Sequence, residues 1–150
     1  MKIAIGNDHA GLDYKNVLVD YIKEKYGYEV VNFGNDVCER DDSYVTFAKK
    51  VAGAVSRGEV DKGILICGTG VGMSLCANKY KGVRCVVCSE PFTARLSRKH
   101  NDTNILAFGA RVIGIELAKM IVDEWLTTEF EGGRHKERID SITEIENGQQ

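Results

Sequence analysis

Short apolar runs alternate along the chain with segments of helical periodicity. The apolar runs are typical of strands and cover residues 2–6, 28–33, 63–67, 83–88 and 105–108. The periodic segments predict helices at 11–24, 47–56, 74–79, 91–99 and 115–126, with a short one from about His135. Because such alternation favours a parallel sheet covered on both faces, we predict an α/β fold: a single three-layer α/β/α Rossmann-like domain with a five-stranded parallel sheet, over residues 1–150.

Polar and reactive residues follow three of the predicted strands. Residues 7–9 read Asn-Asp-His, residues 67–69 read Cys-Gly-Thr, and residues 109–111 read Gly-Ala-Arg. In open parallel sheets, ligands bind beyond the carboxyl ends of the strands. We therefore expect the functional site at this edge of the sheet.

The segment 66–73 alternates three glycines with other residues, as Gly68-x-Gly70-x-Gly72. Glycine lets backbone N–H groups approach a ligand closely, and the start of the following helix adds partial positive charge. This predicts an oxyanion cradle beside the Cys67 thiol and the Thr69 hydroxyl. A plain strand-to-helix turn is the alternative. A dinucleotide fingerprint fits poorly, because Met73 stands where its third glycine belongs.

The composition of the chain argues against nucleic-acid-binding and membrane-spanning proteins. The chain has 150 residues, of which 43% are hydrophobic and 28% charged, and a net charge of -2. That balance is typical of a globular domain and gives no basic excess for nucleic acid. No apolar run approaches the roughly 20 residues that span a bilayer, and the first residues lack a signal-peptide pattern. We expect a cytoplasmic protein without nucleic-acid or membrane partners.

The chain has five cysteines, and because this number is odd we do not expect a framework of disulfides. Cys85 and Cys88 have C-x-x-C spacing, but they lie in a predicted strand rather than at a helix start. Buried small side chains are therefore favoured, with a thiol–disulfide protein as the alternative. No second Cys/His pair has zinc-site spacing, so we predict no metal.

Two further features are ambiguous by themselves. Arg134 and Arg138 have the i, i+4 spacing that places both on one helical face, which also suits a solvated helix. His100 stands at a predicted helix end, where histidine is often a cap.

Taken together, five blocks in order resemble the ribose-5-phosphate isomerase type B family, which includes the allose-6-phosphate and galactose-6-phosphate isomerases. The blocks cover residues 6–11, 66–74, 97–104, 109–114 and 132–135. One departure is Ser43-Tyr44-Val45, where the family often has Asp-Tyr-Pro. Without the proline, we expect a less rigid loop before Tyr44.

The resemblance implies an aldose–ketose isomerase of the pentose phosphate pathway that interconverts ribose 5-phosphate and ribulose 5-phosphate through an enediolate. In the catalytic roles it implies, Cys67 is the base, Thr69 moves protons between the two oxygens, and His100 opens the sugar ring. The substrate-binding residues it implies are Asp8, His9, Tyr44, Gly68, Gly70, Val71, Gly72, Asn101, Arg111, Arg134 and Arg138. The helical tail, about 132–150, supplies the phosphate-binding arginines.

The same resemblance implies no cofactor and no metal. It also implies a homodimer or tetramer with a shared active site, in which His100 reaches a neighbour's Cys67. A related sugar phosphate as substrate, or a non-catalytic nucleotide-binding α/β domain, remains the alternative.

Overall fold

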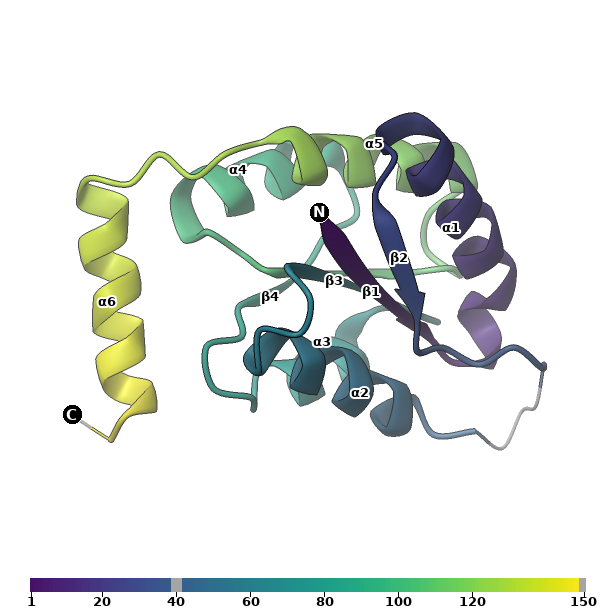
Figure 1. Cartoon of the computed structure of the whole chain (residues 1–150), viewed down its shortest axis with the longest axis horizontal. Coiled ribbons are helices and arrows are strands. Elements are labelled where there is room, and N and C mark those ends of the chain that lie inside the picture. The colour runs from purple at the N-terminus through teal and green to yellow at the C-terminus, as the bar shows by residue number, and fades with distance from the viewer. Residues whose placement is uncertain (39–41, 149–150) are drawn as a thin grey trace.

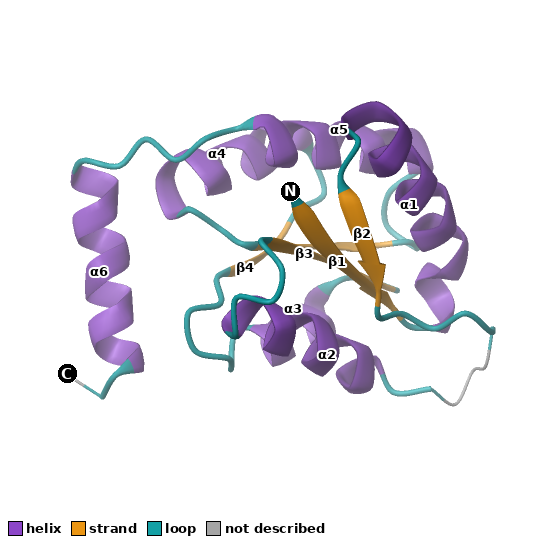
Figure 2. Cartoon of the chain, viewed as in Figure 1, coloured by secondary structure: helices purple, strands orange, loops and turns teal. Residues whose placement is uncertain are grey.

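A five-stranded parallel sheet runs through the centre of the protein in the computed structural model, which describes residues 1–38 and 42–148 (Figures 1 and 2). The strand order is β2-β1-β3-β5-β4, and each neighbouring pair is parallel. The strands are β1 (Lys2–Asn7), β2 (Glu29–Asn32), β3 (Lys62–Cys67), β4 (Cys85–Val87) and β5 (Ile105–Gly109).

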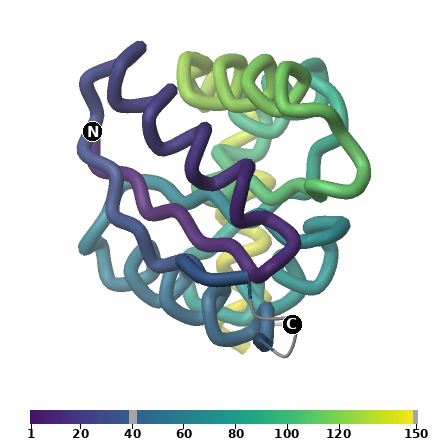
Figure 3. The backbone as a smooth tube through the Cα atoms, turned by 90° about the vertical axis from the view of Figure 1, so that its right-hand side faces the viewer, coloured from purple at the N-terminus to yellow at the C-terminus, as the bar shows by residue number. Residues whose placement is uncertain are grey.

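Helices cover both faces of this sheet. They are α1 (Leu12–Tyr26), α2 (Tyr44–Ser56), α3 (Val71–Ala77), α4 (Pro91–Asn101), α5 (Ile115–Thr127) and α6 (Arg134–Glu146), with a 3-10 turn, η1 (His9–Gly11). Helices α1, α4 and α5 lie on one face, and α2 and α3 lie on the other (Figures 1 and 3). Helix α6 stands outside these layers, at the left of Figure 1. The predicted three-layer α/β/α architecture is confirmed.

Alternate residues of each central strand build two separate cores. In β3, Ile64 and Ile66 belong to the core under α1, α4 and α5, whereas Leu65 and Cys67 belong to the core over α2 and α3. Since successive side chains of a strand point to opposite faces, a strand buried on both sides is apolar throughout. The same alternation turns Cys67 toward the α2/α3 side of the sheet.

Each predicted strand and helix is present, but several bounds were wrong. The fourth strand is only Cys85–Val87, and α2 starts three residues earlier than expected, at Tyr44. Helix α3 starts at Val71 rather than Ser74, because the left-handed Gly70 (φ 83°) turns the chain straight from β3 into the helix. The last helix is not short: it has 13 residues and ends at Glu146. The last two residues of the predicted tail lie outside the described residues.

Among the residues that the structure describes, no helix combines the length and apolar character needed to cross a membrane.

Candidate active site

The carboxyl ends of β1, β3 and β5 bring three sequence segments together. Strands β1 and β3 are neighbours, and the sheet order diverges between them, which is where doubly wound sheets bind ligands. The backbone N–H of Asp8 donates to the Ile66 carbonyl at 3.3 Å, and that of Ala110 donates to the Cys67 carbonyl at 2.8 Å. The polar residues predicted to gather at this edge therefore do so.

Cys67 ends β3 at the bottom of the glycine-rich loop. Its side chain is buried, and the backbone N–H of Gly70 donates to its Sγ at 3.1 Å. A side chain at Gly70 would need positive φ, and its Cβ would lie 2.9 Å from the backbone of Phe108. Only glycine fits there, and its backbone N–H lies against the sulfur as a hydrogen-bond donor.

The Thr69 hydroxyl lies at the exposed rim of the same loop, where it accepts a hydrogen bond from the Val71 N–H at 3.3 Å. Beside it, Tyr44 begins α2 and its ring lies against Gly72, so a Cβ there would be 2.8 Å from ring carbons. Helix α2 begins at Tyr44, directly before Val45, the residue that stands where the family often has proline. The loop thus has a hydroxyl on its rim and an aromatic wall.

Asp8 and His9 follow β1 and face the site from the other side. Asp8 is buried and accepts from the Ala10 N–H at 3.0 Å, while burial raises the pKa of its carboxyl. The His9 Nδ1 lies 2.7 Å from Asp42 Oδ1. The other oxygen of Asp42 accepts from the Asn35 amide at 2.7 Å. Asp42 therefore fixes the His9 ring by Nδ1 and leaves Nε2 free for a ligand.

Partial burial alone would raise the pKa of Asp42, but hydrogen bonds from His9 and Asn35 outweigh it and hold that pKa below its usual value. Sequence reasoning missed Asp42, because it lies 33 residues from His9 in a polar loop without a local pattern. Arg111 also lies at this edge: its side chain is exposed, and its backbone N–H donates to the Gly68 carbonyl at 3.1 Å.

The remaining predicted residues, His100, Asn101, Arg134 and Arg138, lie at the opposite edge of the sheet. Helix α4 ends near the start of β3, since the Gly63 N–H donates to the Asn104 carbonyl at 2.9 Å. Gly63 precedes Cys67 by four residues, about 13 Å along a strand. Figure 1 shows α6 on this side too, away from the tip of β2. One chain alone therefore does not bring His100 to Cys67.

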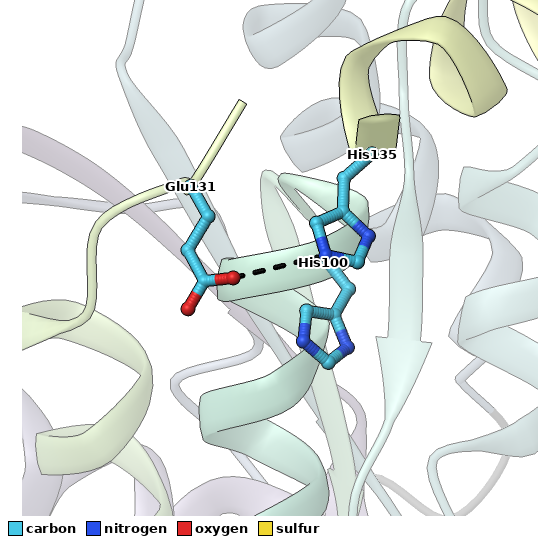
Figure 4. Close-up of side chains that lie close together, drawn as sticks. All are labelled: His100, Glu131 and His135. Atoms are coloured by element: carbon cyan, nitrogen blue, oxygen red, sulfur yellow. Dashed lines mark ion pairs between the residues drawn. The ribbon is translucent and has the colours of Figure 1, made fainter. Parts of the chain in front are cut away.

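At this second edge, the rings of His100 and His135 stack with centroids 4.2 Å apart and planes inclined by 14° (Figure 4). Arg134 and Arg138 are exposed, and within the described residues neither has a carboxylate partner. Two uncommitted guanidinium groups one helical turn apart suit a phosphate.

Two groups of side chains offer possible metal ligands: His100, Glu131 and His135 at one edge, and Asp8, His9 and Asp42 at the other. In the first, nearly parallel rings direct their nitrogen lone pairs along parallel planes rather than toward one ion. In the second, the Nδ1 of His9 is engaged by Asp42. In both groups the ligand atoms nevertheless lie within 4.8 Å of one another, so their spacing alone admits a metal ion.

The two cysteines of the C-x-x-C motif do not have the properties of a thiol–disulfide protein. It requires exposed, reactive thiols at Cys85 and Cys88, but Cys88 is buried and Cys85 is partly buried. Burial raises the pKa of both thiols to about 12. Thiols that ionise so poorly are inert, so they act as small apolar side chains.

A groove of about 760 Å³ separates α6 from the body of the protein. It opens along β4, the edge strand, and has apolar walls from Val83 and Val86 on one side and Ile142 and Ile145 on the other. Asn101 also lines this groove, so the groove reaches the residue next to His100.

Comparison with known protein families decides the classification. The model of the Ribose/Galactose Isomerase family matches residues 3–142. The chain belongs to this family. Membership confirms the resemblance drawn from the sequence blocks, and it replaces the nucleotide-binding alternative as the account of the glycine-rich loop.

Individual relatives agree. Ribose-5-phosphate isomerase B of Escherichia coli (strain K12) is 59% identical over 97% of this chain and 96% of its own length. D-erythrulose-4-phosphate isomerase of Pectobacterium atrosepticum is 42% identical over 95% and 93%, respectively. The crystal structure of ribose-5-phosphate isomerase B from Mycoplasma genitalium with bound ribulose-5-phosphate has a TM-score of 0.94 and 40% identity, covering 97% of this chain and 96% of that one.

Proposed function

We propose that this protein is an aldose–ketose isomerase that interconverts ribose 5-phosphate and ribulose 5-phosphate. The observation that carries the proposal is the Cys67 sulfur, held against the Gly70 N–H at the bottom of a glycine loop. The same fold binds ribulose-5-phosphate in the Mycoplasma genitalium relative. A base beside a row of N–H donors is what an enediolate intermediate needs.

The residues suit each proton transfer. The Cys67 thiolate takes the proton from carbon 2 of the open-chain aldose, which forms the enediolate, and the thiol returns a proton to carbon 1. The Thr69 hydroxyl passes a proton between the oxygens on carbons 1 and 2. The Gly70 and Val71 N–H groups donate to Cys67 and Thr69, and the other backbone N–H groups of residues 68–72 stabilise the negative oxygen. His100 opens the sugar ring by proton transfer at the ring oxygen and the anomeric hydroxyl.

Phosphate binding requires groups from both edges of the sheet. His9, oriented by Asp42, and Arg111 lie at the Cys67 edge, whereas Arg134 and Arg138 lie at the other. We propose that a second copy of the chain closes the site, so that its α4 end and α6 face this chain's glycine loop. Asp8, Tyr44 and Asn101 then contact the sugar.

The groove beside α6 favours this assembly. Val71 and Leu75 on α3 are 51% and 63% exposed, and they follow directly on the Cys67 loop. An apolar helix face of this kind fits the apolar walls of a second copy's groove, and burying it there places Cys67 near the groove-lining Asn101 of that copy. The proposal includes a homodimer or tetramer, no cofactor, and a cytoplasmic location.

A coupled assay with purified protein tests the proposed function. We expect ribose 5-phosphate to be turned over faster than allose 6-phosphate or galactose 6-phosphate. Cys67→Ala should lower kcat by at least about 10²-fold, the lower end for loss of a general base. Cys76→Ala, on the neighbouring helix and outside the site, is the matched control and should retain activity. A folded Cys67→Ala protein with near-normal kcat would refute the proposed base.

A further inference from the structure

His135 takes part in none of the proton transfers above, yet its ring is buried against His100. His135 is the second residue of α6 and is 7% exposed. Its imidazole lies face to face with that of His100, with a centroid distance of 4.2 Å (Figure 4). A buried polar ring needs a reason to be there, because burial costs free energy unless the group is paired.

The chain before α6 is shaped to bring this ring over His100. The Glu131 N–H donates to the Lys99 carbonyl at 3.0 Å, which ties the segment to the last turn of α4. Gly132 and Gly133 then adopt φ values of 67° and 55°, a conformation that few other residues take. This double turn starts α6 with His135 directed back at α4.

The side chains of Glu131 and Lys99 lie beside His135, outside the stacked pair of rings. Glu131 pairs with Lys99 at 3.1 Å, and its other oxygen lies 3.7 Å from the His135 Nε2. Burial lowers the pKa of His135, and the nearby His100 and Arg134 lower it further. A neutral His135 tolerates a protonated ring on its face, whereas a charged one would repel it.

The His100 ring itself has no hydrogen-bonding partner within the part of the chain that the structure describes. Stacking on His135 is therefore the contact that restrains its plane. One His100 nitrogen lies within 4.8 Å of a Glu131 carboxylate oxygen, and neither nitrogen is engaged in a hydrogen bond with a described residue. A group that opens a sugar ring must deliver and accept protons at two oxygens, which requires unblocked nitrogens in a fixed plane.

We propose that His135 is a positioning residue for ring opening: its imidazole holds the His100 ring by stacking, in the orientation that presents the His100 nitrogens to the closed sugar. This inference rests on the proposed function, because it assigns His135 a task only if His100 opens the ring. It adds a residue to the site whose action passes through His100 rather than through the substrate.

Substitutions that keep or remove the flat ring test this role. His135→Phe keeps an aromatic face and should retain most of kcat for ribose 5-phosphate, whereas His135→Leu and His135→Asn should lose about tenfold, the scale of an aromatic pair. In a His100→Asn background, His135→Leu should cause no further loss, because the ring it positions is gone. Circular dichroism confirms folding of each variant.

NMR gives a readout that does not depend on activity. The ring-proton signals of His100 should be shifted by the stacked ring in the wild-type protein and in His135→Phe, and lose that shift in His135→Leu. Any of three results would overturn the positioning role. The His100 signals could keep their shift in His135→Leu; His135→Leu could lower kcat as much in the His100→Asn background as in the wild-type protein; or His135→Phe could lose as much activity as His135→Leu. Unimpaired turnover by His100→Asn alone would instead refute the ring-opening role in the proposed function.

Discussion

Single side chains at the carboxyl edge depend on partners that are distant in sequence. His9 and Asp42 are the clearest case: the carboxylate fixes Nδ1 of the imidazole, and Asn35 fixes the carboxylate. A histidine held in this way presents one defined nitrogen to an anion.

Asp42→Asn should therefore weaken phosphate binding while sparing the chemical step. We expect KM for ribose 5-phosphate to rise about 3- to 10-fold with kcat little changed, a loss of about 1 kcal/mol for one weakened charged contact. Inhibition by inorganic phosphate, which needs only the phosphate subsite, should weaken by a similar factor. An unchanged phosphate inhibition constant would show that Asp42 does not orient His9 for binding.

At this scale, the sequence predicts residues whose signal is local. Cys67 and the glycines of residues 68–72 were predicted because strand, thiol and glycine spacing lie within ten residues. The sequence did not point to the contacts of Asp42 with His9 or of His135 with His100, because each contact joins residues far apart in the chain. Such contacts leave no spacing in the chain.

At the scale of elements, alternation of apolar runs predicted the strands and helices but not their ends. Caps decide the ends: Glu90 accepts from the N–H groups of Phe92 and Thr93 and so starts α4, while Asp102, in a left-handed conformation, stops it. The contacts between elements were also beyond the pattern. Lys62 at the start of β3 lies over the ring of Trp125 in α5, with its Nζ 5.1 Å from the ring centroid.

Burial lowers the pKa of Lys62 to about 8, and the nearby Arg98 adds to this effect. Because the unfolded lysine titrates near 10.4, the folded protein loses this proton first, and the lysine's destabilising contribution fades as pH rises from about 8 to 10.4. Lys62→Met should thus raise the free energy of unfolding by about 1 kcal/mol at pH 7.

Urea unfolding of Lys62→Met and wild-type protein at several pH values checks this. The gain in the free energy of unfolding of Lys62→Met over the wild-type protein should shrink between pH 8 and about 10.4. The titration of buried thiols is the same in both proteins and cancels in this difference. An advantage that stays constant with pH would mean that packing, not charge, is responsible. A less stable variant would mean that the cation–π contact with Trp125 outweighs burial.

At the scale of the whole molecule, the residues of the candidate site divide into two groups at opposite edges of the sheet. Cys67, Asp8 and His9 lie at the carboxyl edge, while His100 and α6 lie at the amino edge. In a dimer with a two-fold axis, the carboxyl edge of each copy can face the amino edge of the other, so two copies can complete two sites at once. The parallel sheet was predictable from sequence; the separation of the two groups follows from α4 running antiparallel to the strands.

Mixing two variants, each with strongly lowered but measurable activity, tests the shared site most directly. Cys67→Ala and His100→Asn each impair both sites of their own dimer. After subunit exchange, each hybrid dimer has one site with both Cys67 and His100 intact. We predict recovery of about a quarter of wild-type activity from an equal mixture, since half of the dimers are hybrids and each has one intact site of two. No recovery after exchange has been verified would contradict the shared site and place Cys67 and His100 in action within one chain.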